Sequence, residues 1–134
     1  MNSTPQAPNV WPAFRARDAR ALIDFLVEAF GFVETVAYEE DGVIHHAQLD
    51  WPEGGGIMLG SHKPGAAWSR QPGTLGAYVV TDDVAAVYDR VQASGATILR
   101  ELASQSYGGE EFSVADPEGN QWSFGSYRGE PQPT

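Results

Sequence analysis

The chain contains no cysteine among its 134 residues, which excludes a disulfide framework, a thiolate metal site and a cysteine nucleophile. It also lacks an apolar run of the ~18 to 20 residues that a membrane-spanning helix needs. Residues 1–8 have neither the basic nor the apolar region of a signal peptide, so we expect residues 1–9 to be a disordered lead-in. The expected location is the cytoplasm, although a chain without cysteine is chemically compatible with either side of a membrane.

Basic residues are also scarce. Eight Lys and Arg stand against eighteen Asp and Glu, which gives a formal net charge of -10. This charge repels nucleic-acid phosphates and anionic lipid, so we expect no nucleic-acid partner and no membrane association. An acidic surface favours solubility and also attracts cationic ligands. The 42% of hydrophobic residues is enough to fill the core of one domain.

An internal repeat organises the chain. Asp18 begins an apolar-periodic stretch that stops at Gly31, and Asp82 begins another that stops at Gly95, so both landmarks recur at the same offset. The apolar spacing predicts an amphipathic helix in each stretch. Asp18 and either Asp82 or Asp83 suit the N-cap positions, and the two glycines suit the left-handed position after a helix.

Strand-like segments surround both helices and predict the order βαβββ twice. In the first half they are Val10–Arg15, Phe32–Tyr38, Val43–Trp51 and Gly56–Gly60, and in the second half Leu75–Thr81, Ala96–Leu102, Glu110–Ala115 and Gln121–Tyr127. We therefore expect an α+β fold of two modules, residues 10–61 and 74–127, with a linker at 62–73 and a tail at 128–134. Trp68 in the linker is interpreted as an apolar anchor between the modules, with a lid over a ligand as the alternative.

Several local sequences resemble the vicinal-oxygen-chelate superfamily of glyoxalases, antibiotic-binding resistance proteins and extradiol dioxygenases. They are Phe14-Arg-Ala-Arg-Asp18, Ile23-Asp-Phe25 with Phe30-Gly-Phe32, and Asp116-Pro-Glu-Gly-Asn-Gln-Trp-Ser-Phe124. His46-Ala-Gln-Leu49 and Ile57-Met-Leu-Gly60 narrow the likeness to the glyoxalase/bleomycin-resistance-like subgroup. The resemblance covers about residues 10–127 and implies cup-shaped mixed sheets, as in the dihydroxybiphenyl dioxygenases, with a ligand in the groove between two half-cups. It also implies a homodimer, because members of this family often exchange modules between chains and bare sheet edges need cover.

In metal-dependent members of the family, His, Gln or Glu occupies one inward position on the first and last strand of each repeat. Those positions fall here on Trp11, on Met58 or an immediate neighbour, on Gly76 and on Ser123. Trp and Gly offer no side-chain donor, a thioether is a poor partner for a hard ion, and a neutral hydroxyl is a weak one. We therefore expect no cofactor, and no stoichiometric divalent ion in the purified protein.

Alternation along the strands selects the side chains that face the groove. It assigns His46 to the groove together with Gln48 and Ile44, and it assigns His45 to the face beneath the helix. Residues that share a strand face with the family's metal positions are added to the predicted binding residues. Glu111 is included because it lies on the face opposite the core residue Phe112. The predicted ligand-binding residues are Trp11, Arg15, His46, Gln48, Met58, Gly76, Tyr78, Glu111, Ser123 and Tyr127.

Three of these residues have two interpretations each. Arg15 either clamps a ligand oxygen with its planar guanidinium or pairs with Glu111 or another carboxylate. His46 either contacts the ligand or hydrogen-bonds a neighbouring strand. Glu111 either acts as a general base with a burial-raised pKa or is an ion-paired strand residue.

The leading functional hypothesis is a metal-independent small-molecule-binding protein that sequesters an aromatic or cationic compound, as antibiotic-resistance members of the family do. Its groove would contain Trp11, Tyr78 and either Trp122 or Tyr127, and no catalytic residue is assigned. One alternative is an enzyme, either a metal-free acid/base catalyst or a glyoxalase-like lyase, isomerase or dioxygenase with a metal site relocated to His46 and Glu111. Another is a non-catalytic interaction module whose groove is filled by its own side chains.

Overall fold

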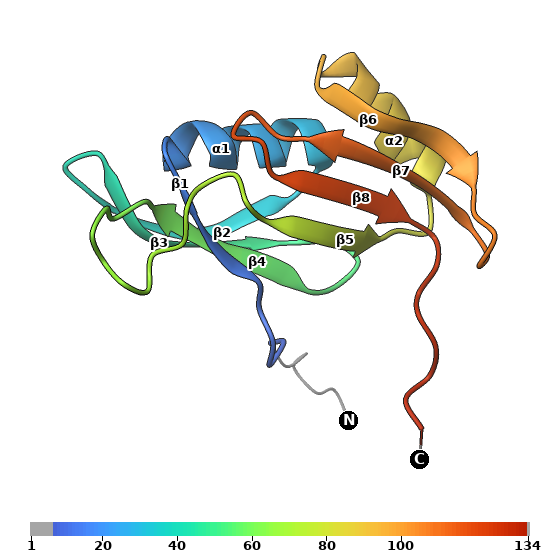
Figure 1. Cartoon of the computed structure of the whole chain (residues 1–134), viewed down its shortest axis with the longest axis horizontal. Helices are drawn as coiled ribbons and strands as arrows, with labels where there is room; N and C mark the ends of the chain where they lie inside the picture. The colour runs from blue at the N-terminus through green and yellow to red at the C-terminus, as the bar shows by residue number, and fades with distance from the viewer. Residues whose placement is uncertain (1–6, 134) are drawn as a thin grey trace, which may run out of the picture.

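The computed structural model describes residues 7–133, which form two four-stranded mixed sheets and two helical segments (Figure 1). In spatial order the first sheet contains β1 (Ala13–Ala16), β4 (Gly56–Ser61), β3 (Val43–Asp50) and β2 (Val33–Glu40). The second contains β5 (Gly76–Val80), β8 (Gln121–Gly125), β7 (Glu110–Ala115) and β6 (Thr97–Ser104). In each sheet the first strand of the module runs parallel to the last, and the other pairs are antiparallel. The α+β fold with βαβββ order twice is confirmed.

The helices begin and end where side-chain and backbone chemistry allow. Asp18 caps α1 (Ala19–Phe25) by accepting a hydrogen bond from the Ala21 amide at 3.1 Å, and α1 continues into a π-helical turn, η1 (Leu26–Phe30). Gly31 ends that turn with a φ of 97°, in the left-handed region that glycine adopts without strain. Of the two aspartates considered for α2 (Val84–Ala93), Asp83 is the cap.

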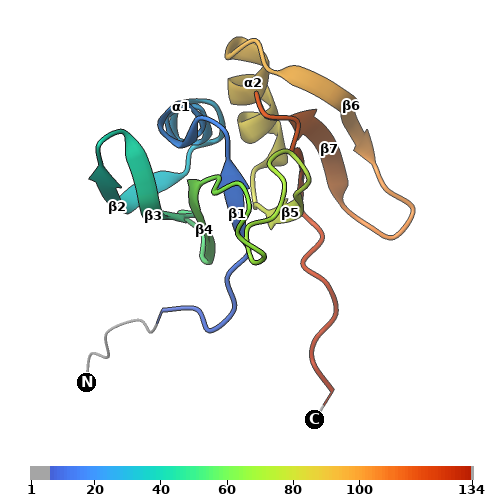
Figure 2. The same ribbon diagram turned by 60° about the vertical axis from the view of Figure 1, so that its left-hand side comes forward.

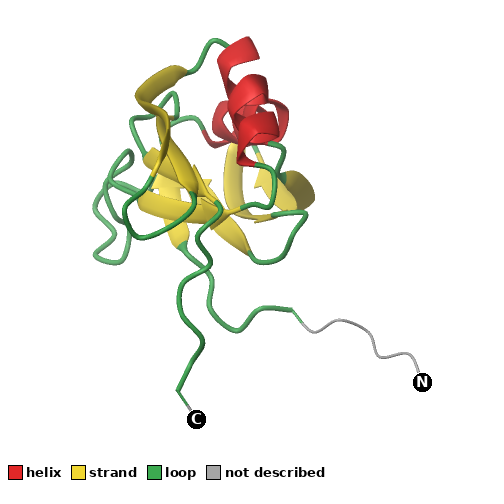
Figure 3. Ribbon diagram, turned by 90° about the vertical axis from the view of Figure 1, so that its right-hand side faces the viewer, coloured by secondary structure: helices red, strands yellow, loops and turns green. Residues whose placement is uncertain are grey.

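The two modules share one hydrophobic core. Both helices lie on the same side of the strands, and the two ends of the described chain leave from the opposite side (Figures 2 and 3). Phe30 of η1 packs edge-on against Trp122 and Phe124 of the second sheet, with ring centroids 5.6 and 5.0 Å apart. Arg90 of α2 donates to the backbone oxygens of Val27 and Glu28 at 3.1 and 3.0 Å, which ties the end of η1 to the second module.

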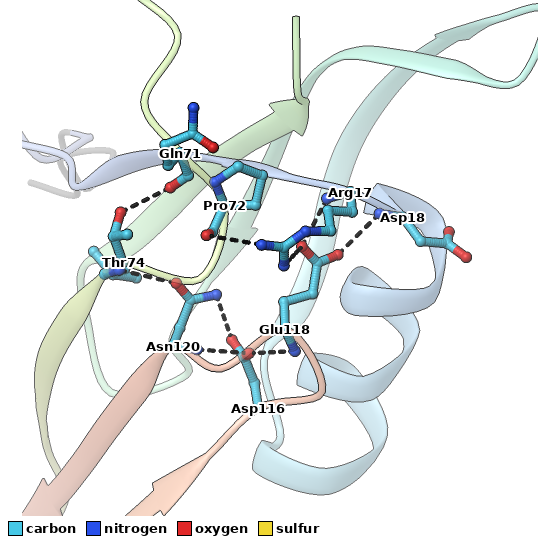
Figure 4. A network of polar contacts seen from close by, with 9 residues as sticks. Arg17, Asp18, Gln71, Pro72, Thr74, Asp116, Glu118 and Asn120 are labelled. Carbon is cyan, nitrogen blue, oxygen red and sulfur yellow. Dashed lines mark hydrogen bonds and ion pairs between the residues drawn. The ribbon is translucent and has the colours of Figure 1, made fainter. Parts of the chain in front are cut away.

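The hairpin at residues 116–120 joins the second module to the start of α1 (Figure 4). The buried Asp116 carboxylate accepts hydrogen bonds from the Glu118 and Asn120 amides, the Asn120 side chain and the Trp122 indole, at 2.8 to 3.0 Å. Glu118 then accepts from the amides of Arg17 and Asp18 at 2.6 and 2.9 Å. The motif that carried the family resemblance is therefore a hydrogen-bonded junction between modules.

Several expectations about single residues were wrong. Strand β1 starts at Ala13 and β8 ends at Gly125, so Trp11 and Tyr127 flank their strands rather than lie within them. Ile44 is buried and His45 is exposed, the reverse of the expectation, because a register shift opposite Tyr38 and Glu39 breaks the alternation there.

Two of the four tryptophans also depart from the expectation. Trp68 is 61% exposed, so it is not an anchor packed between the modules. Trp122 is fully buried in the shared core, which leaves Tyr127 as the groove residue of that pair.

Most of the predicted disordered lead-in lies in residues 1–6, outside the described residues. Within residues 7–133, neither helical segment has the length and apolar character needed to cross a membrane.

Candidate ligand-binding site

The structure divides the ten predicted ligand-binding residues between the two sheets. In each sheet the helices cover the face that carries the core residues, and the predicted residues lie on or beside the other face. The first face carries Trp11, Arg15, His46, Gln48 and Met58, and the second face carries Gly76, Tyr78, Glu111, Ser123 and Tyr127. Across residues 7–133, no hydrogen bond, ion pair or ring contact links the two groups. One chain thus presents two separate half-cups.

Glycines allow long side chains to lie flat on the first face. A Cβ atom at Gly56 would lie 2.7 Å from the Trp11 ring, and one at Gly60 would lie 2.6 Å from an Arg15 guanidinium nitrogen. The Arg15 guanidinium lies 4.7 Å from the ring centroid of Trp68, within cation–π range. The suggested pairing of Arg15 with Glu111 is therefore wrong, because Arg15 stays on the first sheet beneath the linker indole.

The other polar residues of the first face are engaged within their own sheet. His46 stacks on Tyr38 of β2, with ring centroids 6.1 Å apart. The Gln48 amide donates to both carboxylate oxygens of Asp50 at 3.2 and 3.1 Å. These contacts hold both side chains in place along β3.

On the second face, three tyrosines and one glutamate line an open hollow of about 440 Å³, which we call the tyrosine hollow: Tyr78, Tyr107, Glu111 and Tyr127. The Tyr78 ring lies over Gly125, where a Cβ atom would be 2.5 Å from the phenolic oxygen. The Tyr78 hydroxyl donates to the Tyr127 carbonyl at 2.6 Å, and the Tyr107 and Tyr127 rings meet edge to face at 5.2 Å. The hollow thus unites three of the predicted residues with one that was not predicted.

Tyr107, the member that the sequence reasoning missed, lies in the turn between β6 and β7. Gly108 and Gly109 follow it, both with positive φ, and they fold the turn back so that Tyr107 reaches the strand that carries Glu111. An aromatic residue directly before two glycines, ahead of a predicted strand, is the sequence signal for this placement.

Glu111 is the charged centre of the hollow and is only 7% exposed. It accepts a hydrogen bond from the Tyr107 hydroxyl and forms an ion pair with Arg100 of β6. The carboxylate raises the pKa of Tyr107 to about 12, chiefly through that hydrogen bond. The Arg100 guanidinium also donates to the Ser113 hydroxyl at 3.1 Å. Of the two interpretations of Glu111, the structure shows the ion-paired strand residue.

The four family metal positions do not fit a divalent ion. The Trp11 indole N–H already donates to the Pro8 carbonyl at 2.9 Å, and the Ser123 hydroxyl is hydrogen-bonded to Ser113 at 2.8 Å. Met58 offers a thioether and Gly76 no side chain, so the set lacks the nitrogen and carboxylate ligands that such an ion needs. Within residues 7–133, no three His, Asp or Glu side chains gather as a metal site. His46 lies on the first sheet and Glu111 on the second.

A second hollow, of about 380 Å³, lies at the junction of the modules and was not predicted. Its apolar lining includes Phe32, Trp51 and Trp122, which belong to the shared core. Of the charged residues that line it, Glu53 accepts from the Asp82 amide at 2.8 Å, and Arg128 pairs with the Asp82 carboxylate. This junction hollow therefore differs from the tyrosine hollow in that none of its lining residues is a buried carboxylate.

Known proteins place this arrangement in a family. TioX from Micromonospora sp. ML1 matches with a TM-score of 0.75 and 27% identity, over 89% of this chain and 98% of that one. TnmS3, an antibiotic-binding protein from Streptomyces sp. CB03234, has a TM-score of 0.72 and 20% identity, over 93% and 98% of the two chains. An uncharacterised protein of Mycobacterium tuberculosis is 35% identical over 126 residues, 88% of this chain and 74% of the relative. The family model of the Glyoxalase/Bleomycin resistance protein/Dioxygenase superfamily matches residues 10–124, and the chain belongs to that superfamily.

Proposed function

We propose that this protein binds an aromatic or cationic small molecule and holds it without chemical conversion. The tyrosine hollow is the observation that carries the proposal. Three aromatic rings and a nearly buried carboxylate converge there on an open space of about 440 Å³, which is within the size range of small-molecule sites. Aromatic rings supply stacking and cation–π attraction, while a carboxylate fixes the orientation of a polar group.

A binding role suits the chemistry of both faces. Sequestration requires affinity alone, and the positions that hold metal ligands in other members of the superfamily contain Trp, Met, Gly and Ser here. The antibiotic-binding protein TnmS3 has the same fold, so the scaffold is compatible with such a role. We propose that the protein acts in the cytoplasm by sequestering its ligand, in the manner of resistance proteins of this superfamily.

We further propose that the working unit is a homodimer. Each chain presents a first face and a second face that do not meet within the chain, and apart from the buried Glu111 their predicted residues are half-buried or exposed. Exposed aromatic side chains accompany both faces, with Trp68 61% and Tyr107 52% exposed. A second copy would cover both faces by placing its own first face over the second face of its partner.

A thermal-shift panel of aromatic and amine-bearing compounds tests the proposed function. We expect one or more compounds to raise the melting temperature of the wild-type protein, because a ligand that binds only the folded state stabilises it. Tyr127→Ala should reduce that rise by removing one wall of the hollow. Leu99→Ala, which removes an exposed apolar side chain from β6 outside the hollow, serves as the control. Equal loss of the rise in both variants, or no rise with any compound, would contradict the proposal.

A further inference from the structure

We propose that the tyrosine hollow is selective for an organic cation, an ammonium group carried on an aromatic or otherwise apolar body. This inference rests on the proposed function and narrows its ligand class. It follows from the hydrogen-bond donors, the charges and the position of Arg100 around the hollow.

The hydroxyl protons of the three lining tyrosines are already committed to protein acceptors. Tyr78 donates to the Tyr127 carbonyl at 2.6 Å, Tyr107 donates to Glu111, and Tyr127 donates to Glu130 at 3.0 Å. What the lining side chains still offer is ring faces and oxygen lone pairs. Those groups accept a cation or a hydrogen-bond donor, and they give an anionic ligand nothing to bind.

Two carboxylates and one guanidinium, that of Arg100, lie at the hollow, so its charges sum to a negative value that favours a cation. The Glu111 side chain is 8% exposed, so water and salt screen its field less than that of a surface carboxylate. Glu130 adds a second carboxylate beside the Tyr127 hydroxyl. A cation over a tyrosine ring is attracted by the negative face of the π system, and a nearby carboxylate strengthens that attraction.

Arg100, the ionic partner of Glu111, does not fill the hollow. It is not among the lining residues, and its side chain is 55% exposed. It contacts one carboxylate oxygen, while the Tyr107 hydroxyl contacts the other. An ionised carboxylate has about four lone-pair sites, so both oxygens can accept a further bond from an ammonium group inside the hollow.

Three probes with one phenylbutyl body and different end groups test the inference by calorimetric titration of the full chain at neutral pH and constant ionic strength. They are phenylbutylamine, phenylbutanol and phenylbutyrate. We expect the amine to bind about tenfold or more tightly than the alcohol, and the carboxylate to bind more weakly than the alcohol. An alcohol that binds as tightly as the amine would overturn the cation preference and leave the proposed function standing. Failure of all three probes to bind the folded wild-type protein would instead overturn the proposed function.

Matched variants locate the selectivity. Glu111→Gln should bring the amine-to-alcohol affinity ratio close to one, whereas Glu110→Gln, the same charge change at the exposed neighbouring position, should leave the ratio unchanged. Tyr107→Leu should lower the ratio several-fold while the fold is kept, because this side chain is half exposed in a turn. The last variant provides the test if Glu111→Gln does not fold. An equal effect of Glu110→Gln and Glu111→Gln would overturn the inference, since it would assign the preference to the net charge of the chain. An unchanged ratio in both Glu111→Gln and Tyr107→Leu would overturn it as well.

Discussion

A glycine decides the position of one aromatic ring in the tyrosine hollow. Gly125 of β8 leaves room for the Tyr78 ring, and a Cβ atom there would lie 2.5 Å from the Tyr78 oxygen and 2.9 Å from a ring carbon. Gly76, on the neighbouring strand β5, has open space on its side-chain position. A side chain at Gly125 would thus collide with Tyr78, whereas a side chain at Gly76 would meet no neighbour, although each glycine lies in a strand.

Alanine substitutions at these two glycines provide a matched pair. Gly125→Ala should displace Tyr78 and lower the free energy of unfolding by about 1 to 3 kcal/mol, the usual effect of overpacking. Gly76→Ala should leave stability unchanged or raise it slightly, because alanine is favoured over glycine in a strand. Urea unfolding of the two variants checks this expectation. Equal stability of both would contradict the account of the Tyr78 position.

The tyrosines of the hollow also predict a pH dependence. The hydrogen bond to Glu111 raises the pKa of Tyr107 to about 12, so the neutral phenol is favoured in the folded state. The stabilisation is therefore complete below the ordinary tyrosine pKa near 10 and is lost as the pH rises through about 12. A spectrophotometric titration should show a tyrosine that ionises near pH 12 and that is missing in Tyr107→Phe. A variant that instead loses a tyrosine ionising near the ordinary pKa of about 10 would contradict the hydrogen bond.

The sequence predicted single residues well where strand alternation is regular. Glu111 and Ser113 lie opposite the buried Phe112, as expected, because β7 pairs without interruption with β8. The assignment failed for His45, the residue of β3 that the pairing with β2 skips, where the alternation is broken. It also failed to find Tyr107, because a turn residue has no periodicity, and its side-chain direction depends on the glycines that follow it.

At the scale of elements, the best-predicted features are those with local chemical signals. The aspartate caps, the left-handed glycines and the β7 bounds Glu110–Ala115 follow the sequence closely. The ends of β1 and β8 were placed too far out, because Val10, Trp11 and Tyr127 extend a strand-like pattern beyond Ala13 and Gly125, the residues at which the two strands begin and end. The π-helical turn at the end of α1 likewise depends on packing against the second module, through the contacts of Phe30 and of Arg90 with its carbonyls.

The hairpin after β7 is held by the buried Asp116 carboxylate and reaches the first module through Glu118. Asp116→Asn replaces one acceptor oxygen by an N–H₂ group that would face the donors of Asn120 and Trp122. Because these donors are buried, we expect a loss of about 2 to 4 kcal/mol in the free energy of unfolding. Glu101→Gln, an exposed carboxylate of β6, should change stability by less than about 0.5 kcal/mol. Chemical denaturation compares the two variants, and a loss of similar size in both would contradict the role given to the hairpin.

At the scale of the whole molecule, the division of the predicted residues between two faces was not visible in the sequence. The repeat predicted two equivalent modules, but not that their helices and core residues would pack together and leave both faces open. That arrangement depends on contacts between residues far apart in the chain, such as Phe30 with Trp122. Faces that cannot meet within one chain are the basis of the proposed dimer.

A mixing experiment tests whether the two faces meet between chains. Trp11→Ala alters the first face and Tyr127→Ala the second, and each alone should weaken binding of phenylbutylamine by about tenfold through lost ring contacts. In a mixed dimer, the intact first face of one chain and the intact second face of the other would form one unaltered site. An equal mixture of the two variants should therefore regain tight sites after subunit exchange. Light scattering that shows a particle of 14.5 kDa, or a mixture without regained binding, would contradict the shared site.

The central claim is that a small molecule binds in the tyrosine hollow, and amide chemical-shift mapping tests it most directly. Nitrogen-labelled wild-type protein is titrated with phenylbutylamine until the shifts no longer change. We predict that the largest changes belong to Tyr78, Tyr107, Glu111 and Tyr127, while helix α1 is unaffected because it packs against the first sheet. A titration that leaves these four amides unchanged, or that shifts mainly Phe32 and Trp51 in the junction hollow, would contradict the account.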